Sequence, residues 1–511
     1  MRLLPAPGAV GANKRGKSTY RPTSRIAKGD GLPGRFTVSG RAAAAHTRGM
    51  ARTVTALVTA GGEYLGAVGP FPVAVPWWSE VEPIVAHLHG VLGVPVLVLR
   101  LLGVDGGEGA RDGHVTYHVE AERRSDRSAP LAGHLVDPAA LTEPAPPGHL
   151  VDPAALTEPA PLAVRLVDPA ALTEPAPLAG HPVDLAALTE PDPLRLPWAT
   201  AGGVRELLDW ATDTLATMGR PLTGPPEQRR TWNLAALFRL PTAVGPAWLK
   251  ATPPFAADEA AILTAVAAVD PGLVPAVLAA GERRILLAHL PGEDCWNAGP
   301  EIIAAAVHRW VAVQATLAEA PGGLPAGLRD RRTPVLVDEV GALLDGPVGG
   351  QLTADERAAA WRLARRWPEL DGCGLPAATL VHGDFHSGNW RASPGHPPAV
   401  LDFADAYLGN PVLDGLRVLE FLPEPKRPAA ARAWVAAWTA RAPGSNPSRA
   451  LAVAEPLGYL SYAVRYQEFL DNIEPSERIY HADDPVNVIR VALRLAREPG
   501  AHLAARAGRG S

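Results

Sequence analysis

The chain has 511 residues and a formal net charge of −5, with 47% hydrophobic and 20% charged residues. This composition excludes a chain that is disordered along its whole length and leaves room for about two to four domains. No run of about 18 residues is apolar without a charge or a proline, so no membrane-spanning helix is predicted. Two cysteines are too few for a disulfide framework, so a cytoplasmic location is expected, and the mildly acidic body argues against nucleic acid as a partner.

The first 50 residues are basic, with ten Lys or Arg residues and one acid, and they show no apolar periodicity. They are predicted to form a disordered tail, and they lack the apolar stretch of a secretory signal. Met50 opens the first patterned segment and is an alternative first residue.

Residues 51–125 are predicted to form a small α/β domain of unknown role. Apolar alternation and β-branched residues indicate strands, and a 3.6-residue period indicates a helix. The expected strands are 52–58, 65–75, 94–102 and 114–121, and the expected helix is 79–92.

An internal repeat follows. The sequence LVDPAALTEP occurs at 135, 150 and 166, and the variant PVDLAALTEP occurs at 182. Proline recurs too often for long helices or central strands, and each unit has too few apolar residues for a core. Residues 126–197 are therefore predicted to be an acidic, Pro-rich repeat linker, and deletion of three copies should leave folding intact. A binding role for the repeat is the alternative.

The remainder, residues 198–511, is predicted to be globular and α+β. From 291 onward helices are expected to predominate, apart from a short β segment near 378–404. Before that point the expected helices are 204–218 and 256–269, and the expected strands are 231–240, 243–252 and 283–289.

The most informative stretch places polar residues at the ends of two apolar strands. His382-Gly383-Asp384 follows the first strand, Asn389 lies five residues after Asp384, and Asp402 ends the second strand, 18 residues after Asp384. Two acids and an amide at strand ends are typical of a site that handles metal and phosphate. A rival interpretation takes His382, Asp384 and His386, at i, i+2 and i+4, as ligands of a zinc hydrolase.

This pattern resembles the catalytic loop and the metal-binding aspartate of protein kinases. The His-Gly-Asp form with Gly388-Asn389, and Asp402-Phe403 without a following glycine, is more specifically similar to the aminoglycoside phosphotransferase family of small-molecule kinases. Asp414 matches the usual downstream aspartate of that family.

The resemblance covers roughly residues 200–480 and implies a two-lobed protein-kinase-like fold. The N-lobe is expected at 198–290 and the mostly helical C-lobe at 291–511. The resemblance implies that Asp384 is catalytic, that His382 holds its loop, and that Asn389 and Asp402 bind Mg²⁺ together with ATP. GTP stays open as the nucleotide.

Lysine usage points to the nucleotide contacts. The chain has five lysines against 43 arginines, and Lys250 is the only lysine between 28 and 426. A lysine that persists in such a chain is expected where arginine cannot substitute, and the resemblance assigns Lys250 to the nucleotide phosphates. Glu259 is expected to pair with it, with Asp258 as the adjacent alternative. No G-x-G-x-x-G precedes Lys250, so Asn233 would serve in the phosphate-covering loop, and His289 lies where the base is expected.

The sequence therefore predicts an ATP- and Mg²⁺-dependent phosphotransferase, or kinase, that acts on a hydroxyl of a small molecule. An aminoglycoside or another cationic alcohol is favoured if a late acidic cluster lines the cleft, and a solvated acidic helix face is the alternative. A nucleotide-sensing binding or regulatory protein without turnover is the alternative from a different class. The cluster comprises Glu468, Asp471, Glu474, Glu477, Asp483 and Asp484.

Overall fold

The first element in this computed structural model is a strand that begins at Arg52. The structure describes residues 52–107, 109–124, 188, 190–320 and 322–497, all within one unit, Val38–Ser511. The predicted tail at 1–50 and most of the predicted linker at 126–197, namely 126–187 and 189, lie outside the described residues. Among the described residues, no helix is both long and apolar enough to cross a membrane.

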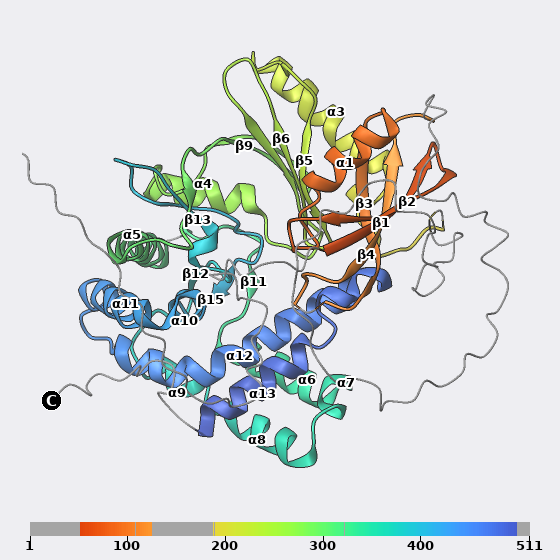
Figure 1. Ribbon diagram of the computed structural model, residues 1–511. Helices are drawn as coiled ribbons and strands as arrows, with labels where there is room; N and C mark the ends of the chain where they lie inside the picture. Colours follow the sequence, from red (N-terminus) through yellow and green to blue (C-terminus); the bar gives the residue numbers. More distant parts are fainter. Residues whose placement is uncertain (1–51, 108, 125–187, 189, 321, 498–511) are drawn as a thin grey trace, which may run out of the picture. The chain divides into compact units, whose positions relative to one another are not determined.

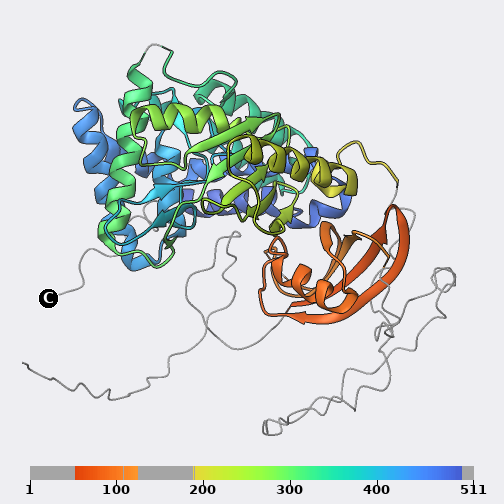
Figure 2. The same cartoon turned by 90° about the horizontal axis from the view of Figure 1, so that it is seen from above.

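The first sheet has four strands in the order β2-β1-β4-β3, with β1 parallel to β4 and the other pairs antiparallel. Helix α1 packs on it and shares its apolar core, which includes Val54, Ile84 and Val98 (Figure 2, red to orange). The strands and the helix predicted for this stretch are all present, with ends that differ by a few residues. Their bounds are β1 (Arg52–Ala60), β2 (Glu63–Val73), α1 (Glu82–Leu92), β3 (Val96–Asp105) and β4 (His114–Ala121).

The second sheet is a five-stranded antiparallel sheet in the order β5-β6-β7-β9-β8 (Figure 1). Alternating burial along β6 turns Ala236, Phe238 and Leu240 toward a core shared with α3. The bounds are η3 (Pro197–Ala199), α3 (Ala201–Thr217), β5 (Glu227–Trp232), β6 (Ala235–Leu240), β7 (Ala247–Ala251), α4 (Glu259–Val269), β8 (Val277–Gly281) and β9 (Arg284–Ala288).

Two expectations for this sheet were wrong. The single strand predicted over 231–240 is two strands, because the chain turns at Asn233-Leu234. Apolar residues on both sides of the turn continue the strand pattern across it, and only Asn233 is typical of a turn. Strand β8 was not predicted, because its short segment is rich in alanine, which carries little strand preference.

Strand β5 is an edge strand of the second sheet, yet its outer side is occupied. The amide of Val81 donates to the carbonyl of Arg229, and the amide of Thr231 donates to the carbonyl of Ser79. The side-chain amide of Gln228 also bonds both main-chain groups of Val98 in β3, at 2.9 and 2.7 Å. The segment just before α1, together with β3, thus covers the open edge of the second sheet.

The rest of the described chain is mostly helical, as predicted, with two small three-stranded sheets in the orders β10-β13-β14 and β11-β15-β12. The largest apolar core lies here, and α12 runs beside α13 (Figure 1). The described chain is therefore of mixed α+β class. The bounds are β10 (Glu293–Asp294), α5 (Pro300–Glu319), β11 (Arg329–Asp330), α6 (Thr333–Asp345), α7 (Pro347–Gly350), α8 (Ala354–Ala364), α9 (Pro368–Asp371), β12 (Thr379–Val381), η4 (Ser387–Asn389), β13 (Trp390–Ala392), β14 (Ala399–Val400), β15 (Tyr407–Gly409), α10 (Val412–Phe421), η5 (Glu424–Lys426), α11 (Arg427–Arg441), α12 (Pro447–Asn472), η6 (Pro475–Tyr480) and α13 (Asp484–Arg497).

Candidate active site

Lys250 lies between two carboxylates. Its Nζ is 2.7 Å from Oε2 of Glu259 on α4 and 2.6 Å from Oδ1 of Asp402. Burial alone would lower the pKa of Lys250, but the carboxylates of Asp402 and Glu259 outweigh burial and raise that pKa. The ammonium group is therefore charged and held in place. Its bond to Asp402 connects two residues that are 152 positions apart in the chain.

The choice between Asp258 and Glu259 is decided by helix capping. Asp258 is the N-cap of α4, and its side chain accepts hydrogen bonds from the amides of Ala260 and Ala261. Glu259, one residue later, is buried and turns toward Lys250. Its other oxygen, Oε1, accepts a bond of 2.9 Å from the amide of Phe403, so Glu259 also holds the segment that carries Asp402.

The loop that carries Asp384 is fixed by a buried aspartate of α10. Oδ2 of Asp414 accepts from the amide of His382 at 2.9 Å, and Oδ1 accepts from the amide of Gly383 at 3.1 Å. Trp310 and Gln314 of α5 donate to the same Oδ2 at 2.8 and 3.0 Å. Four donors from two elements thus set the start of the loop.

His382 fits the expected role of holding the loop. It is fully buried, and its Nδ1 accepts from the amide of Asp384 at 3.2 Å. Nε2 lies 3.0 Å from the carbonyl of Leu401, so Nε2 carries the proton. Burial lowers the pKa of His382, which keeps the ring neutral. The ring therefore links the loop of Asp384 to the residue just before Asp402.

Both oxygens of the Asp384 carboxylate accept hydrogen bonds. Oδ1 accepts from Nε and Nη2 of Arg417 at 2.9 and 2.8 Å. Oδ2 accepts from Nδ2 of Asn389 at 2.9 Å and lies 3.2 Å from Nε2 of His386. Burial alone would raise the pKa of Asp384, but His386 and Arg417 hold it well below its usual range. Asp384 is thus an ionised and tightly oriented carboxylate.

The oxygens of Asn389 and Asp402 suit a hard divalent cation. Asn389 uses its amide nitrogen for Asp384, and Asp402 uses Oδ1 for Lys250, so the other oxygen of each side chain could serve a ligand. Asp402 has a φ of +66°, a left-handed conformation that aspartate tolerates better than most residues. The Asp402 side chain is 49% exposed, so a cation with its waters can reach it.

The rival zinc interpretation finds no support in the side-chain geometry. Nδ1 of His386 accepts from the amide of Gly388 at 3.0 Å, and its Nε2 faces Asp384. Both nitrogens of His382 are used by main-chain groups. Across the described residues, no three His, Cys, Asp or Glu side chains are grouped to hold a metal ion.

Among the described residues, the two remaining predicted nucleotide contacts form hydrogen bonds outside this cluster. Asn233, at the β5–β6 turn, is buried, and its amide donates to the main-chain carbonyl of Glu477 at 3.3 Å. His289 follows β9, stacks on Trp248 and accepts its indole N–H at 3.1 Å. The structure therefore brings together Lys250, Glu259 and Asp402, and separately Asp384 with its loop partners.

The carboxylates of three of the six late acidic residues bind arginines or the main chain. Glu468 pairs with Arg329, Arg331 and Arg465. Glu474 binds Arg100 and Arg195, and the carboxylate of Glu477 accepts from the amide of Leu101. These three acids are thus engaged by arginines or by the main chain and give no support for a cationic acceptor, while Asp471 and Asp483 are exposed.

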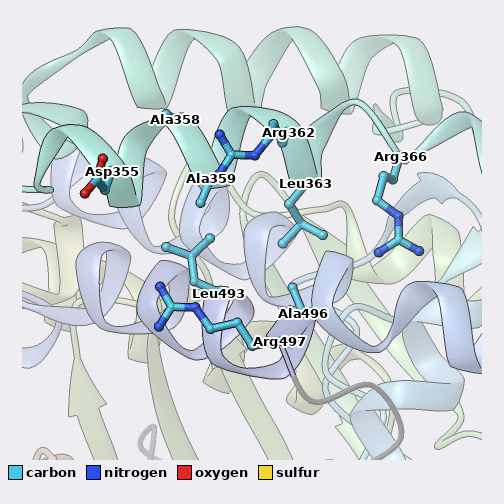
Figure 3. Close-up of a pocket in the computed structure, with 9 residues that line it drawn as sticks. All are labelled: Asp355, Ala358, Ala359, Arg362, Leu363, Arg366, Leu493, Ala496 and Arg497. Atoms are coloured by element: carbon cyan, nitrogen blue, oxygen red, sulfur yellow. The ribbon is translucent and has the colours of Figure 1, made fainter.

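A groove of about 390 Å³ lies between α8 and α13, and none of the predicted site residues lines it (Figure 3). Its walls combine small apolar side chains with three arginines and one aspartate. The lining residues are Asp355, Ala358, Ala359, Arg362, Leu363, Arg366, Leu493, Ala496 and Arg497.

Sequence reasoning missed Arg417, the side chain with two hydrogen bonds to Asp384. In a chain with 43 arginines, one more arginine in a helix carries no signal by itself. The available signal was its position, three residues after Asp414 on one helix face.

Residues 237–451 match the sequence model of a family described as the phosphotransferase enzyme family, APH. A comparison with curated proteins gave no match. Among solved structures, the chain is similar to a choline/ethanolamine kinase family protein from Mesorhizobium loti, with 18% identity, a TM-score of 0.43 and coverage of 58% of this chain and 98% of that one.

Two further solved structures give comparable values. A choline kinase from Streptococcus pneumoniae has 13% identity and a TM-score of 0.44, over 57% of this chain and 99% of that one. A macrolide 2′-phosphotransferase from Brachybacterium faecium has 20% identity and a TM-score of 0.39, over 55% of this chain and 97% of that one. The family match, which includes Lys250, Asp384 and Asp402, carries the identification. Residues 237–451 are therefore similar to the phosphotransferase enzyme family, the kind of family that the resemblance predicted.

Proposed function

We propose that this protein transfers the γ-phosphoryl group of ATP to a hydroxyl of a small molecule. The observation that carries the proposal is the position of Lys250 between Glu259 and Asp402, with an ionised Asp384 held on an adjoining loop. The proposal includes a protein-kinase-like division into an N-lobe at 198–290 and a C-lobe at 291–511, supported by a five-stranded antiparallel sheet followed by mostly helical chain.

In the proposed reaction the bond between the γ-phosphorus and the β,γ-bridging oxygen breaks, and a bond from the γ-phosphorus to the acceptor oxygen forms. Asp384 orients the hydroxyl and takes its proton. A carboxylate whose pKa lies well below the usual range is a weak base, so orientation is its larger contribution. Lys250 contacts the phosphates, and Mg²⁺ held by Asn389 and Asp402 would neutralise phosphate charge.

The proposal assigns a hydroxyl and leaves the charge of the acceptor to experiment. Two acids of the late cluster, Glu468 and Glu474, are paired with arginines and are therefore already neutralised within the protein. A neutral or anionic alcohol is therefore as compatible with the described residues as a cationic one. The remaining contacts expected in the nucleotide site, Asn233 and His289, belong to the same proposal.

The test is a binding and turnover measurement on the full chain. Calorimetry with Mg²⁺ and ATP, and separately GTP, is followed by ADP or GDP release with panels of cationic, neutral and anionic alcohols. Asp384→Asn should keep nucleotide binding and lose at least about 100-fold in turnover. Binding without turnover under any condition would favour the nucleotide-sensing alternative, and no binding by folded protein would contradict the proposal.

A further inference from the structure

Two helices carry the same five-residue pattern, R-x-x-E-F. It reads RVLEF at 417–421 on α10 and RYQEF at 465–469 on α12. Residues i, i+3 and i+4 lie on one face of a helix, so each pattern presents an arginine, a glutamate and a phenylalanine together.

The two patterns make the same contacts. Arg417 donates from Nε and Nη2 to Oδ1 of Asp384, and from Nη1 to Oε2 of Glu420 at 2.8 Å. Its Cζ lies 4.3 Å from the ring centroid of Phe421 and 4.8 Å from that of Tyr462. Hydrogen bonds fix the guanidinium group within its plane, and the two rings fix it from the faces.

Arg465 repeats this arrangement at a second aspartate. It donates from Nε, at 3.0 Å, and from Nη2 to Oδ1 of Asp405, and from Nη1 to Oε2 of Glu468 at 2.6 Å. Its Cζ lies 4.4 Å from the ring centroid of Phe469 and 5.8 Å from that of Phe255. The Arg417 and Arg465 side chains are both 11% exposed, so the two pairs are equally sheltered from solvent.

The two aspartates belong to adjoining loops. Asp405 lies three residues after Asp402, and a Cβ at Gly383 would come within 2.3 Å of the Asp405 carbonyl oxygen. Gly383 has a φ of +81°, so the close approach and the backbone both require glycine there. The two loops are therefore in contact, and each is held from its own helix.

We infer that Arg417 and Arg465 are a pair of positioning residues, one for each acid-bearing loop of the phosphoryl-transfer site. Arg417 orients the carboxylate of Asp384, and Arg465 sets the segment of Asp402 through Asp405. This inference rests on the proposed function. Lysine keeps the charge but loses the planar fork and the stacking, so Arg→Lys isolates the geometric contribution.

The experiment uses the full chain with Arg417→Lys, Arg465→Lys and the control Arg309→Lys. Arg309, on α5, makes a comparable two-bond pair with Asp270, the C-cap residue of α4, outside the site. Amide hydrogen exchange is measured for segments 382–389 and 402–409, together with kcat, the nucleotide KM and the Mg²⁺ dependence. Thermal melting of each variant tests its folding.

Arg417→Lys is expected to speed exchange selectively in 382–389 and to lower kcat by about 10–100-fold, with the nucleotide KM within about twofold. Arg465→Lys is expected to speed exchange selectively in 402–409 and to raise the Mg²⁺ concentration for half-maximal rate by about 5–10-fold. Arg309→Lys should change none of these quantities. If Arg417→Lys does not fold, Glu420→Gln, which removes the negative charge that pairs with Nη1 of Arg417, should give the same pattern with smaller amplitude.

Three results would separate the possible failures. Equal loosening of both segments by both lysine variants would overturn the inference. Selective loosening with wild-type turnover would also overturn it, because the loops would then be held without effect on the reaction. A wild-type protein that transfers no phosphoryl group would overturn the proposed function, and selective exchange would in that case still support the two-loop arrangement.

Discussion

At the scale of single residues, Lys250 is unusual both as a lysine in an arginine-rich chain and in its position between two carboxylates. Arginine replaces lysine almost everywhere in this chain, yet an ammonium group sits within 2.7 Å of two carboxylates. A guanidinium group is larger and planar and cannot occupy the same point between them. This explains in physical terms why the sequence could single out Lys250 without any structure.

Both Lys250→Arg and Lys250→Ala should lower phosphoryl transfer by about 10²–10³-fold, because neither places a compact charge on the phosphates. The matched control is Lys426→Arg. Lys426 is the other lysine of the described residues, and its Nζ donates to the carbonyl of Ala298 at 2.6 Å. Steady-state rates with saturating nucleotide are the measurement, and a Lys250→Arg enzyme within tenfold of wild type would contradict the assignment.

At the scale of elements, α10 holds the loop of Asp384 through side chains on two of its turns. Asp414 in the first turn accepts four hydrogen bonds, and Arg417 one turn later reaches Asp384. Burial raises the pKa of Asp414, and the main-chain and side-chain donors act against that rise. The helix therefore fixes the loop through a buried polar network, and such a network stabilises the fold only when all of its hydrogen bonds are made.

Asp414→Asn should destabilise the protein by about 2–4 kcal/mol, because the amide NH₂ would face donors and leave buried groups unsatisfied. Thermal melting is expected to show a fall of roughly 5 °C or more. Asp355→Asn is the control, since Asp355 also lies in the first turn of a helix but is exposed. Equal melting temperatures for the two variants would contradict the role given to Asp414.

Local spacing explains how far the sequence could predict this site. Asp384, Asn389 and Asp402 lie within 18 residues of one another at strand ends, so their pattern survives without tertiary information. The contacts of Arg417 with Tyr462 and of Arg465 with Asp405 span 45 and 60 residues, so no short motif encodes them. The turn at Asn233 was missed although its signal is local, because one turn residue was outweighed by its apolar neighbours.

At the scale of the whole molecule, Glu474 joins three distant segments. Its Oε2 accepts from Arg100 of β3 at 2.8 Å and from Arg195 at 3.0 Å, and the side chains of Arg100 and Glu474 are almost fully buried. Glu477 lies one turn later, and Tyr480 packs its ring edge-on between Trp78 and Trp232. The segment after α12 therefore connects the first sheet to the β5–β6 hairpin.

This segment predicts a pH dependence of stability. Burial and the neighbouring Glu474 raise the pKa of Glu477 from 4.5 to about 8. Between these two values the folded state keeps a proton that the unfolded chain has lost, so the free energy of unfolding falls as pH rises. The loss should be on the order of 2–4 kcal/mol over that window.

Glu477→Gln keeps an oxygen for the amide of Leu101 and removes the titration. The free energy of unfolding of this variant should therefore fall less between pH 5 and 8 than that of the wild type. The difference between the two should be about 2–4 kcal/mol. Urea unfolding at several pH values measures this difference. Glu63→Gln is the control, because Glu63 is exposed on β2 and far from this segment in sequence. Parallel curves for Glu477→Gln and wild type would contradict the prediction.

The covered edge of β5 has a consequence for any shortened form of the protein. A chain that begins near Trp198 would lose Ser79 and Val81, which bond the outer side of β5, and the β3 partner of Gln228. Open strand edges recruit other strands, so such a fragment should aggregate as it is concentrated, while the full chain stays monodisperse in light scattering. The segment before α1 and strand β3 thereby protect the second sheet from intermolecular strand addition.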